Sequence, residues 1–280
     1  MKKQVAHFSS PVLTAAVVLF CNASQADQSW QVHYQRWQDA EINVVVNGES
    51  SSIDRAEYFV AYQWQTPAST EKLSYTHQPV LIRVGKPAHN GYFHRLDFTY
   101  ESVIDRVEFS FTGGLHGSSN MFNHAKFHSD ALVISATAML PLPTTTGKVG
   151  FGADHRFGHF RIYPQLYWEH VFDNGQQLVI NFPAHVHWWV RPQRWQVGFE
   201  SYGEKWGALD ADRKVESAFY LREYRLFSRW SLPHSRLGDW QLSVGVSMET
   251  QVEYLDLQLG RRQQQLDTAV FAAIGAEFGA

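Results

Sequence analysis

The sequence predicts an all-β fold, namely an antiparallel up-and-down transmembrane β-barrel. Three observations predict it: an N-terminal segment with the features of a secretory leader, repeated runs in which every second residue is apolar, and no later apolar stretch near the roughly 18 residues that a membrane helix needs. A chain that crosses a bilayer without helices must close its strands into a barrel, because an open sheet edge leaves backbone groups unpaired in lipid.

The leader is basic at its start, with Lys2 and Lys3, and then apolar from Pro11 to Cys21. Small residues precede Asp27, so we expect a signal peptide over residues 1–26 that is cleaved after Ala26. The only cysteine leaves with this segment, and Phe20 before it does not fit a lipoprotein signal. Residues 27–280 are expected to form a single outer-membrane barrel domain, exported to the cell outer membrane.

Charge and composition argue against a nucleic-acid partner and for a single domain. Removal of the leader changes the formal net charge from −3 to −5, which does not favour nucleic-acid binding. The remaining 254 residues contain no linker rich in Pro, Gly or Ser and no long run of one charge. With strands of about 9 to 11 residues plus connections, this length suits about 12 strands, with about 10 to 14 possible.

Alternation of apolar and polar residues is the main strand signal. One face often begins or ends with Trp, Tyr or Phe, whereas the other repeatedly carries Arg with Glu or Asp, as expected for an aromatic girdle outside and a charged interior. The alternating runs begin at Tyr58, Leu96, Val107, Phe160, Ile180, Trp195 and Trp240. On this assignment Trp168, Trp188, Trp195 and Trp240 face outward, and the lumen-lining residues are Arg161, Glu169, His185, His187, Arg191 and Glu200.

Connections between the runs fit hairpins. Short turns are predicted at Asn47-Gly48, Asp173-Asn174-Gly175 and Leu237-Gly238-Asp239, and longer outside loops at 113–129 and 201–214. The last run, which ends on Phe278, resembles the terminal strand that barrel-assembly machinery recognises, although Gly279 and Ala280 follow it.

Part of the chain also resembles a group of uncharacterised bacterial outer-membrane β-barrel proteins. The segments that carry the resemblance are 163–168 (YPQLYW), 177–183 (QLVINFP), 188–192 (WWVRP) and 195–198 (WQVG). The likeness as a whole extends over about a third of the chain. The resemblance implies a barrel, and it implies no activity.

An enzymatic alternative rests on His116 and Ser118. Their His-x-Ser spacing resembles that of outer-membrane phospholipase A and of lipid A deacylases, in which histidine activates serine. Strand parity, however, places both side chains with Glu108 on the interior, whereas a lipid hydrolase needs them facing the bilayer. A polar surface position is the simpler interpretation.

Two groups of histidines are candidate metal sites. His185 and His187 share a strand face, and His116, His124 and His128 fall in one segment, but no carboxylate or thiol completes either set. We therefore expect no metal and no cofactor. The sequence favours a non-enzymatic barrel, porin-like or structural, with outer-membrane lipids and a small solute as partners; the alternatives are the lipid hydrolase and a soluble periplasmic β-sandwich.

Overall fold

The computed structural model describes residues 28–38, 40–46, 49–82, 91–143, 146–155, 159–209, 216–232, 238–256 and 260–279. Residues 1–27 and the predicted Asn47-Gly48 turn lie outside this part of the chain. The first half of the sheet comprises β1 (Gln28–Trp37), β2 (Ala40–Val46), β3 (Glu49–Gln65), β4 (Ser69–Ile82), β5 (Gly91–Ile104), β6 (Val107–Ser118), β7 (Leu132–Pro141) and β8 (Lys148–Asp154). The second half comprises β9 (Arg161–Val171), β10 (Gln177–Phe182), β11 (His185–Arg191), β12 (Trp195–Leu209), β13 (Glu216–Ser231), β14 (Asp239–Asp256), β15 (Gly260–Gln265) and β16 (Ala269–Gly279).

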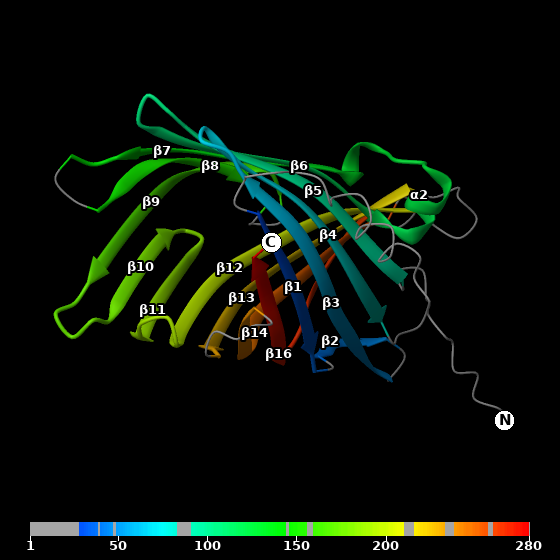
Figure 1. Cartoon of the computed structure of the whole chain (residues 1–280). Helices are drawn as coiled ribbons and strands as arrows, with labels where there is room; N and C mark the ends of the chain where they lie inside the picture. The colour runs from blue at the N-terminus through cyan, green and yellow to red at the C-terminus, as the bar shows by residue number, and fades with distance from the viewer. Residues whose placement is uncertain are drawn as a thin grey trace.

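These strands close into one antiparallel barrel (Figure 1). The first strand closes the ring, because β1 pairs with β16 on one side and with β3 on the other. Of the 16 strands in the sheet, β2 pairs only along β3 and β15 only along β14, so the ring itself has fourteen strands. The up-and-down barrel predicted from the sequence is confirmed, at the upper end of the expected strand number.

The outer surface of the barrel is apolar. Ile162 on β9 is 74% exposed and Phe151 on β8 is 65% exposed, and the same face carries Val244 on β14 and Leu226 on β13. Such a continuous exposed apolar surface marks a face that contacts lipid rather than water. The soluble sandwich alternative is not favoured, because it would bury this face.

Aromatic side chains gather where the strands meet the short turns. Trp195 lies directly across from Trp230, and Trp30 lies across from both Tyr62 and Phe278. Trp188 and Trp240 share the outer face with them, and Trp168 stacks on His170 of the same face, 5.4 Å between ring centroids. This arrangement is the aromatic girdle expected at a membrane interface.

Several connections follow the prediction, and others correct it. The Asp173-Asn174-Gly175 turn joins β9 to β10, with Gly175 at φ +79° and its amide bonded to the Phe172 carbonyl. The predicted run from Ile180 to Trp188 is instead two strands, β10 and β11, separated by Pro183 and Ala184. Because Asn181 pairs with His185, four positions further along the chain, the alternation of faces passes through the turn unchanged.

The long loops predicted at 113–129 and 201–214 are mostly strand and helix where the structure describes them, and residues 210–214 lie outside the described part. Residues 113–118 continue β6, which is followed by α2 (Ser119–His124) and the 3₁₀ helix η2 (Ser129–Ala131), and residues 201–209 continue β12. No helix in the described ranges is long and apolar enough to cross a membrane.

The barrel wall is uneven in height. The hairpin of β10 and β11 is short, whereas β12 and β13 extend far beyond it (Figure 1). Above the hairpin, β12 reaches β6 through one parallel pairing, Gly207 with Gly117. We call the end of the barrel next to α2 the upper end. There β6 and β12 are brought together, so this end is pinched, and the strands β7 to β11 surround only the lower part of the barrel.

Candidate functional site in the lumen

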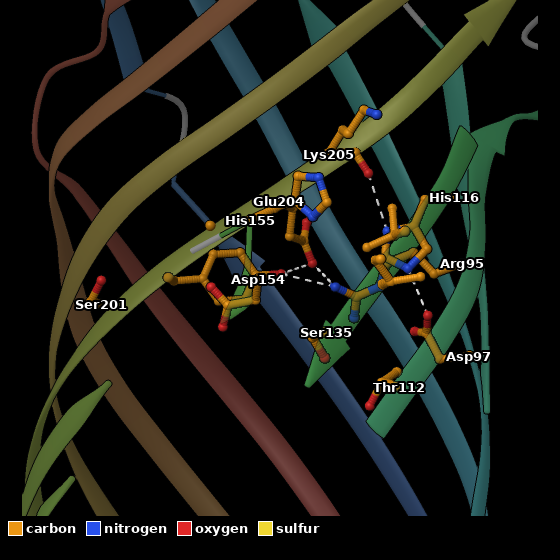
Figure 2. Close-up of a pocket in the computed structure, with 14 residues that line it drawn as sticks. Arg95, Asp97, Thr112, His116, Ser135, Asp154, His155, Ser201, Glu204 and Lys205 are labelled. Atoms are coloured by element: carbon orange, nitrogen blue, oxygen red, sulfur yellow. Dashed lines mark hydrogen bonds and ion pairs between the residues drawn. The ribbon is translucent and has the colours of Figure 1, made fainter. Parts of the chain in front are cut away.

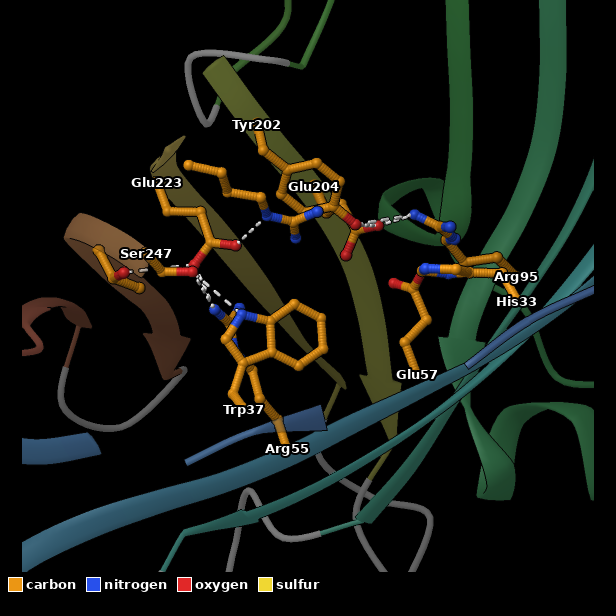
Figure 3. Close-up of polar contacts among 11 residues, drawn as sticks. His33, Trp37, Arg55, Glu57, Arg95, Tyr202, Glu204, Glu223 and Ser247 are labelled. Carbon is orange, nitrogen blue, oxygen red and sulfur yellow. Dashed lines mark hydrogen bonds and ion pairs between the residues drawn. The ribbon is translucent and has the colours of Figure 1, made fainter. Parts of the chain in front are cut away.

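Six charged side chains meet inside the barrel (Figure 3). They are three arginines and three glutamates on the inner faces of β3, β5, β12 and β13: Arg55, Glu57, Arg95, Glu204, Glu223 and Arg225. We call this set the lumen cluster. The three arginines pair with Glu223 and Glu204, whereas Glu57 lies 4.0 Å from His33 Nδ1. Buried ions without a nearby opposite charge would be strongly unfavourable.

Glu223 is the centre of one half of the lumen cluster. It is 0% exposed and forms an ion pair with Arg55, while its other oxygen accepts from Arg225 Nε at 2.7 Å. The guanidinium of Arg225 lies 3.6 Å from the ring centroid of Tyr202, and that of Arg55 lies 4.1 Å from the ring of Trp37. These cation–π contacts position each guanidinium over an aromatic ring.

The second half lies at the pinched end of the barrel. Arg95 on β5 forms an ion pair with Glu204 on β12 and also donates to the hydroxyls of Tyr202 and Thr76. Counted along the ring of fourteen, β5 and β12 lie seven strands apart, but at this level only β6 separates them, because His116 lies across from Arg95 and bonds to the Lys205 carbonyl. The ion pair therefore lies inside the pinched end, where β12 meets β6.

An aromatic layer lies beside this ion pair. Phe93 of β5 stacks on Phe219 of β13 with 5.8 Å between ring centroids, and Trp206 of β12 packs against both rings. The inner faces of β5, β12 and β13 thus meet through a small hydrophobic core. In the part of the chain that the structure describes, these side chains fill the upper lumen.

The lower wall contains most of the side chains that the sequence predicted to line the lumen. His185 and His187 stack with 4.1 Å between ring centroids, and His187 Nε2 lies 3.1 Å from Glu200 Oε1. Glu169 accepts from the Tyr167 hydroxyl and from the Gln177 amide, each at 2.7 Å. The register joins them into one surface, because Glu169 is across from Val179 and Val179 is across from His187.

Two predicted lumen residues lie apart from this surface. Arg161 is exposed at the start of β9, across from Asp154. A register shift at the end of β11 pairs Arg191 with Trp195, so Arg191 falls on the face of the aromatic girdle rather than on that of His187. A β-bulge adds one residue and therefore reverses the face of every residue beyond it, which the alternation alone did not reveal. The roles of all six residues in passage stay predictions.

The His116 and Ser118 pair has other partners. His116 Nε2 lies 2.6 Å from Asp97 Oδ1 and its Nδ1 lies 3.1 Å from the Lys205 carbonyl oxygen, so both ring nitrogens are engaged. The Ser118 hydroxyl accepts from the Leu209 amide at 3.1 Å. A general base needs a free nitrogen within reach of the serine hydroxyl, and this ring offers none. Gly114 makes room for the contact, since a Cβ there would lie 2.0 Å from Asp97 Oδ1.

Hydrogen bonds from a turn and a side chain take the place of strand pairing along part of β12. Among the described strands, none pairs with this edge of β12 between the β11 pairing and Gly207, which pairs with Gly117. The Ser201 amide donates to the Ala184 carbonyl, and the Lys205 carbonyl accepts from His116. His116 thus has a structural role, because its side chain bonds a backbone carbonyl at the edge of β12.

The described residues contain no group of three or more His, Cys, Asp or Glu arranged to hold a metal ion. His124 ends α2, and His128 caps η2 by accepting from the Asp130 amide at 3.2 Å. His155 follows the end of β8, and burial, helped by the charge of Lys205, lowers its pKa to about 4. Its ring is therefore neutral at neutral pH.

The amino-acid sequence shows no relative among the known proteins compared. No protein-family model and no curated protein sequence matches the chain. Among solved structures, an outer membrane channel from Pseudomonas putida F1 has a TM-score of 0.43 at 10% identity, covering 92% of this chain and 97% of the other. OccK2 of Pseudomonas aeruginosa, solved in complex with glucuronate, has a TM-score of 0.32 at 7% identity, covering 91% and 98%. OpdK of Pseudomonas aeruginosa has a TM-score of 0.31 at 8% identity, covering 91% and 99%.

Sequence reasoning missed the lumen cluster. None of its six residues is among the predicted lumen-lining residues, and no alternating run is predicted for the strand that carries Glu223 and Arg225. A usable signal was present: Arg55 with Glu57, and Glu223 with Arg225, are opposite charges two residues apart, and therefore on one strand face.

Proposed function

We propose that this protein is an integral, non-enzymatic barrel of the cell outer membrane that passes small polar solutes through a lumen closed by the pair Arg95 and Glu204. The observation that carries the proposal is a closed barrel whose pinched end holds a buried ion pair between β5 and β12. Charged rings and constrictions of this kind select solutes in pores.

A reversible closure requires contacts that can separate. The bonds that cross from β5 to β12 are made by side chains, and the lumen below them has a polar wall that includes Glu200, Gln196 and Glu169. Outer-membrane lipids contact the apolar outer face, and the barrel-assembly machinery recognises the strand that ends at Phe278. Solute entry then depends on separating the arginine from the glutamate.

Single-channel recording in planar bilayers tests the proposal. The double variant Arg95→Ala with Glu204→Ala removes both partners and leaves neither charge alone, so it should raise the open conductance well above that of the native barrel. The matched control is Arg36→Ala with Asp54→Ala, an ion pair of 3.3 Å between β1 and β3 with an exposed arginine. Equal conductance in native, opened and control barrels would contradict closure by this pair.

A structural role in the envelope is the second candidate. The filled upper lumen favours it, since Trp206, Phe93 and Phe219 pack there as a core. A barrel of this kind should conduct neither in its native form nor after loss of the ion pair. The same recordings therefore separate the two candidates.

A further inference from the structure

A cavity of about 250 Å³ lies beside the closure, between the upper edge of β12 and the inner faces of β5 to β8 (Figure 2). Its lining includes Arg95, His116, Ser135, His155 and Glu204. At about 30 Å³ for each water, this space holds roughly eight waters or one small solute. The cavity therefore adjoins the residues that close the lumen.

The charges around the cavity already have partners. Arg95 is paired with Glu204, His116 with Asp97, and Lys205 Nζ with Asp130 at 3.0 Å. An ionic ligand would have to break one of these pairs or remain uncompensated, and both are unfavourable in a buried site. The cavity is therefore unsuited to an organic acid or to a simple cation.

Among the residues that the structure describes, three polar atoms of side chains that line the cavity have no hydrogen-bond partner. They are Glu204 Oε2, Arg95 Nε and His155 Nδ1, and Glu204 and His155 are only 4% and 9% exposed. Buried polar atoms in native proteins are nearly always bonded, so these three indicate a missing donor and a missing acceptor. A hydroxyl group supplies both functions at once.

We propose that this cavity binds a small uncharged solute rich in hydroxyl groups, of the polyol or monosaccharide class. Its hydroxyls donate to Glu204 Oε2 and accept from Arg95 Nε, while the existing ion pairs stay intact. That this solute is the one the barrel carries rests on the proposed function, whereas binding itself does not.

Isothermal titration calorimetry of the folded protein in detergent micelles tests the binding. Glucose and glycerol are titrated as probes, with acetate and glycine as charged and zwitterionic controls. Glucose or glycerol should give saturable heat with one site, and acetate and glycine should give none. No heat from either hydroxyl-rich probe, which would mean that the cavity holds water only, overturns the proposal, and so does tighter binding of acetate or glycine.

Two variants locate the site. Ser135→Leu fills the cavity and His155→Leu removes one unpartnered nitrogen, so each should weaken binding by at least about tenfold, equivalent to about 1.4 kcal/mol. The matched control is Ser110→Leu, on the inner face of β6 but outside the cavity lining, which should bind as the native protein does. Heat-dependent migration in gel electrophoresis reports that each variant is folded. Unchanged binding in both cavity variants overturns the assignment.

Liposome swelling with the same solutes separates this inference from the proposed function. Binding without swelling keeps the site and contradicts passage. Swelling without saturable binding contradicts the site and keeps passage.

Discussion

At the scale of single residues, the buried charges of the lumen depend on one another. Glu223 accepts hydrogen bonds from Arg55 and Arg225, and Thr250 Oγ1 lies 3.3 Å from it. Glu223→Ala leaves two buried guanidinium groups without their carboxylate, so we expect a loss of about 3–5 kcal/mol in the free energy of unfolding. Urea unfolding of the barrel in liposomes measures it.

The control for Glu223 is Glu101→Ala, at an exposed site on β5. Its effect should stay within about 0.5 kcal/mol. Equal losses in the two variants would mean that the lumen cluster does not stabilise the barrel.

His116 provides a chemical prediction. Because both of its nitrogens have structural partners, His116→Ala and Ser118→Ala should leave fatty-acid release from phospholipid micelles at the level of a protein-free blank, as should the native protein. His116→Ala should also destabilise the barrel by about 1–3 kcal/mol, since it strips partners from Asp97 and from the Lys205 carbonyl. Release of fatty acid that both substitutions abolish would promote the hydrolase alternative.

The outer face provides a further prediction. Val244 on β14 is exposed on the apolar surface, so Val244→Arg should cost about 2–4 kcal/mol near the bilayer midplane. Gln241→Arg, near the end of the same strand, should cost much less. Refolding into lipid vesicles with urea titration compares the two. Similar costs would contradict the orientation of this strand.

At the scale of elements, the alternating runs correspond to β3, β5, β6, β9 to β12 and β14. Strands such as β8 and β13 were not among them, although Phe151 and Leu226 lie on the apolar outer face. The far end of β12 was also missed, for a physical reason. Along residues 201–209, the face that should be apolar carries Ser201 and Lys205, which are buried because the Ala184 turn and Asp130 cover them. A covered outer face need not be apolar, so β12 looked like a loop beyond Glu200.

The junction of β6 and β12 can be tested at Gly207. A Cβ at this position would lie 3.0 Å from the Ala131 Cβ and 3.0 Å from the His128 ring, so Gly207→Val should push η2 away from β12. We expect faster hydrogen exchange in residues 117–131 and unchanged exchange in the lower strands, measured by mass spectrometry. The control is Gly279→Val, which has open space around it. Native-like exchange in the Gly207 variant would show that the junction tolerates separation.

At the scale of the whole molecule, the girdles, the strand faces and the hairpin at Asp173 could be predicted because each depends on local sequence. The lumen cluster could not, because Arg95 and Glu204 are far apart in the chain and meet only when fourteen strands close. The pinch at Gly207 and Gly117 is equally non-local. Alternation defines which side chains point inward, whereas ring geometry decides which of them touch.

The lower wall gives the last prediction, which concerns ion preference. His185 and His187 lie together beside Glu200, and His170 lies on the outer face against Trp168. A proton gained by either ring adds positive charge to the wall, so acidification should shift the reversal potential toward anion preference. His185→Gln with His187→Gln should remove most of the shift, and His170→Gln should leave it unchanged. The reversal potential is recorded under a salt gradient in the Arg95→Ala and Glu204→Ala barrel, in which the lumen is open. It is compared between native histidines, the double histidine variant and the His170→Gln control. A shift that survives the double histidine variant would assign the titrating wall to other residues.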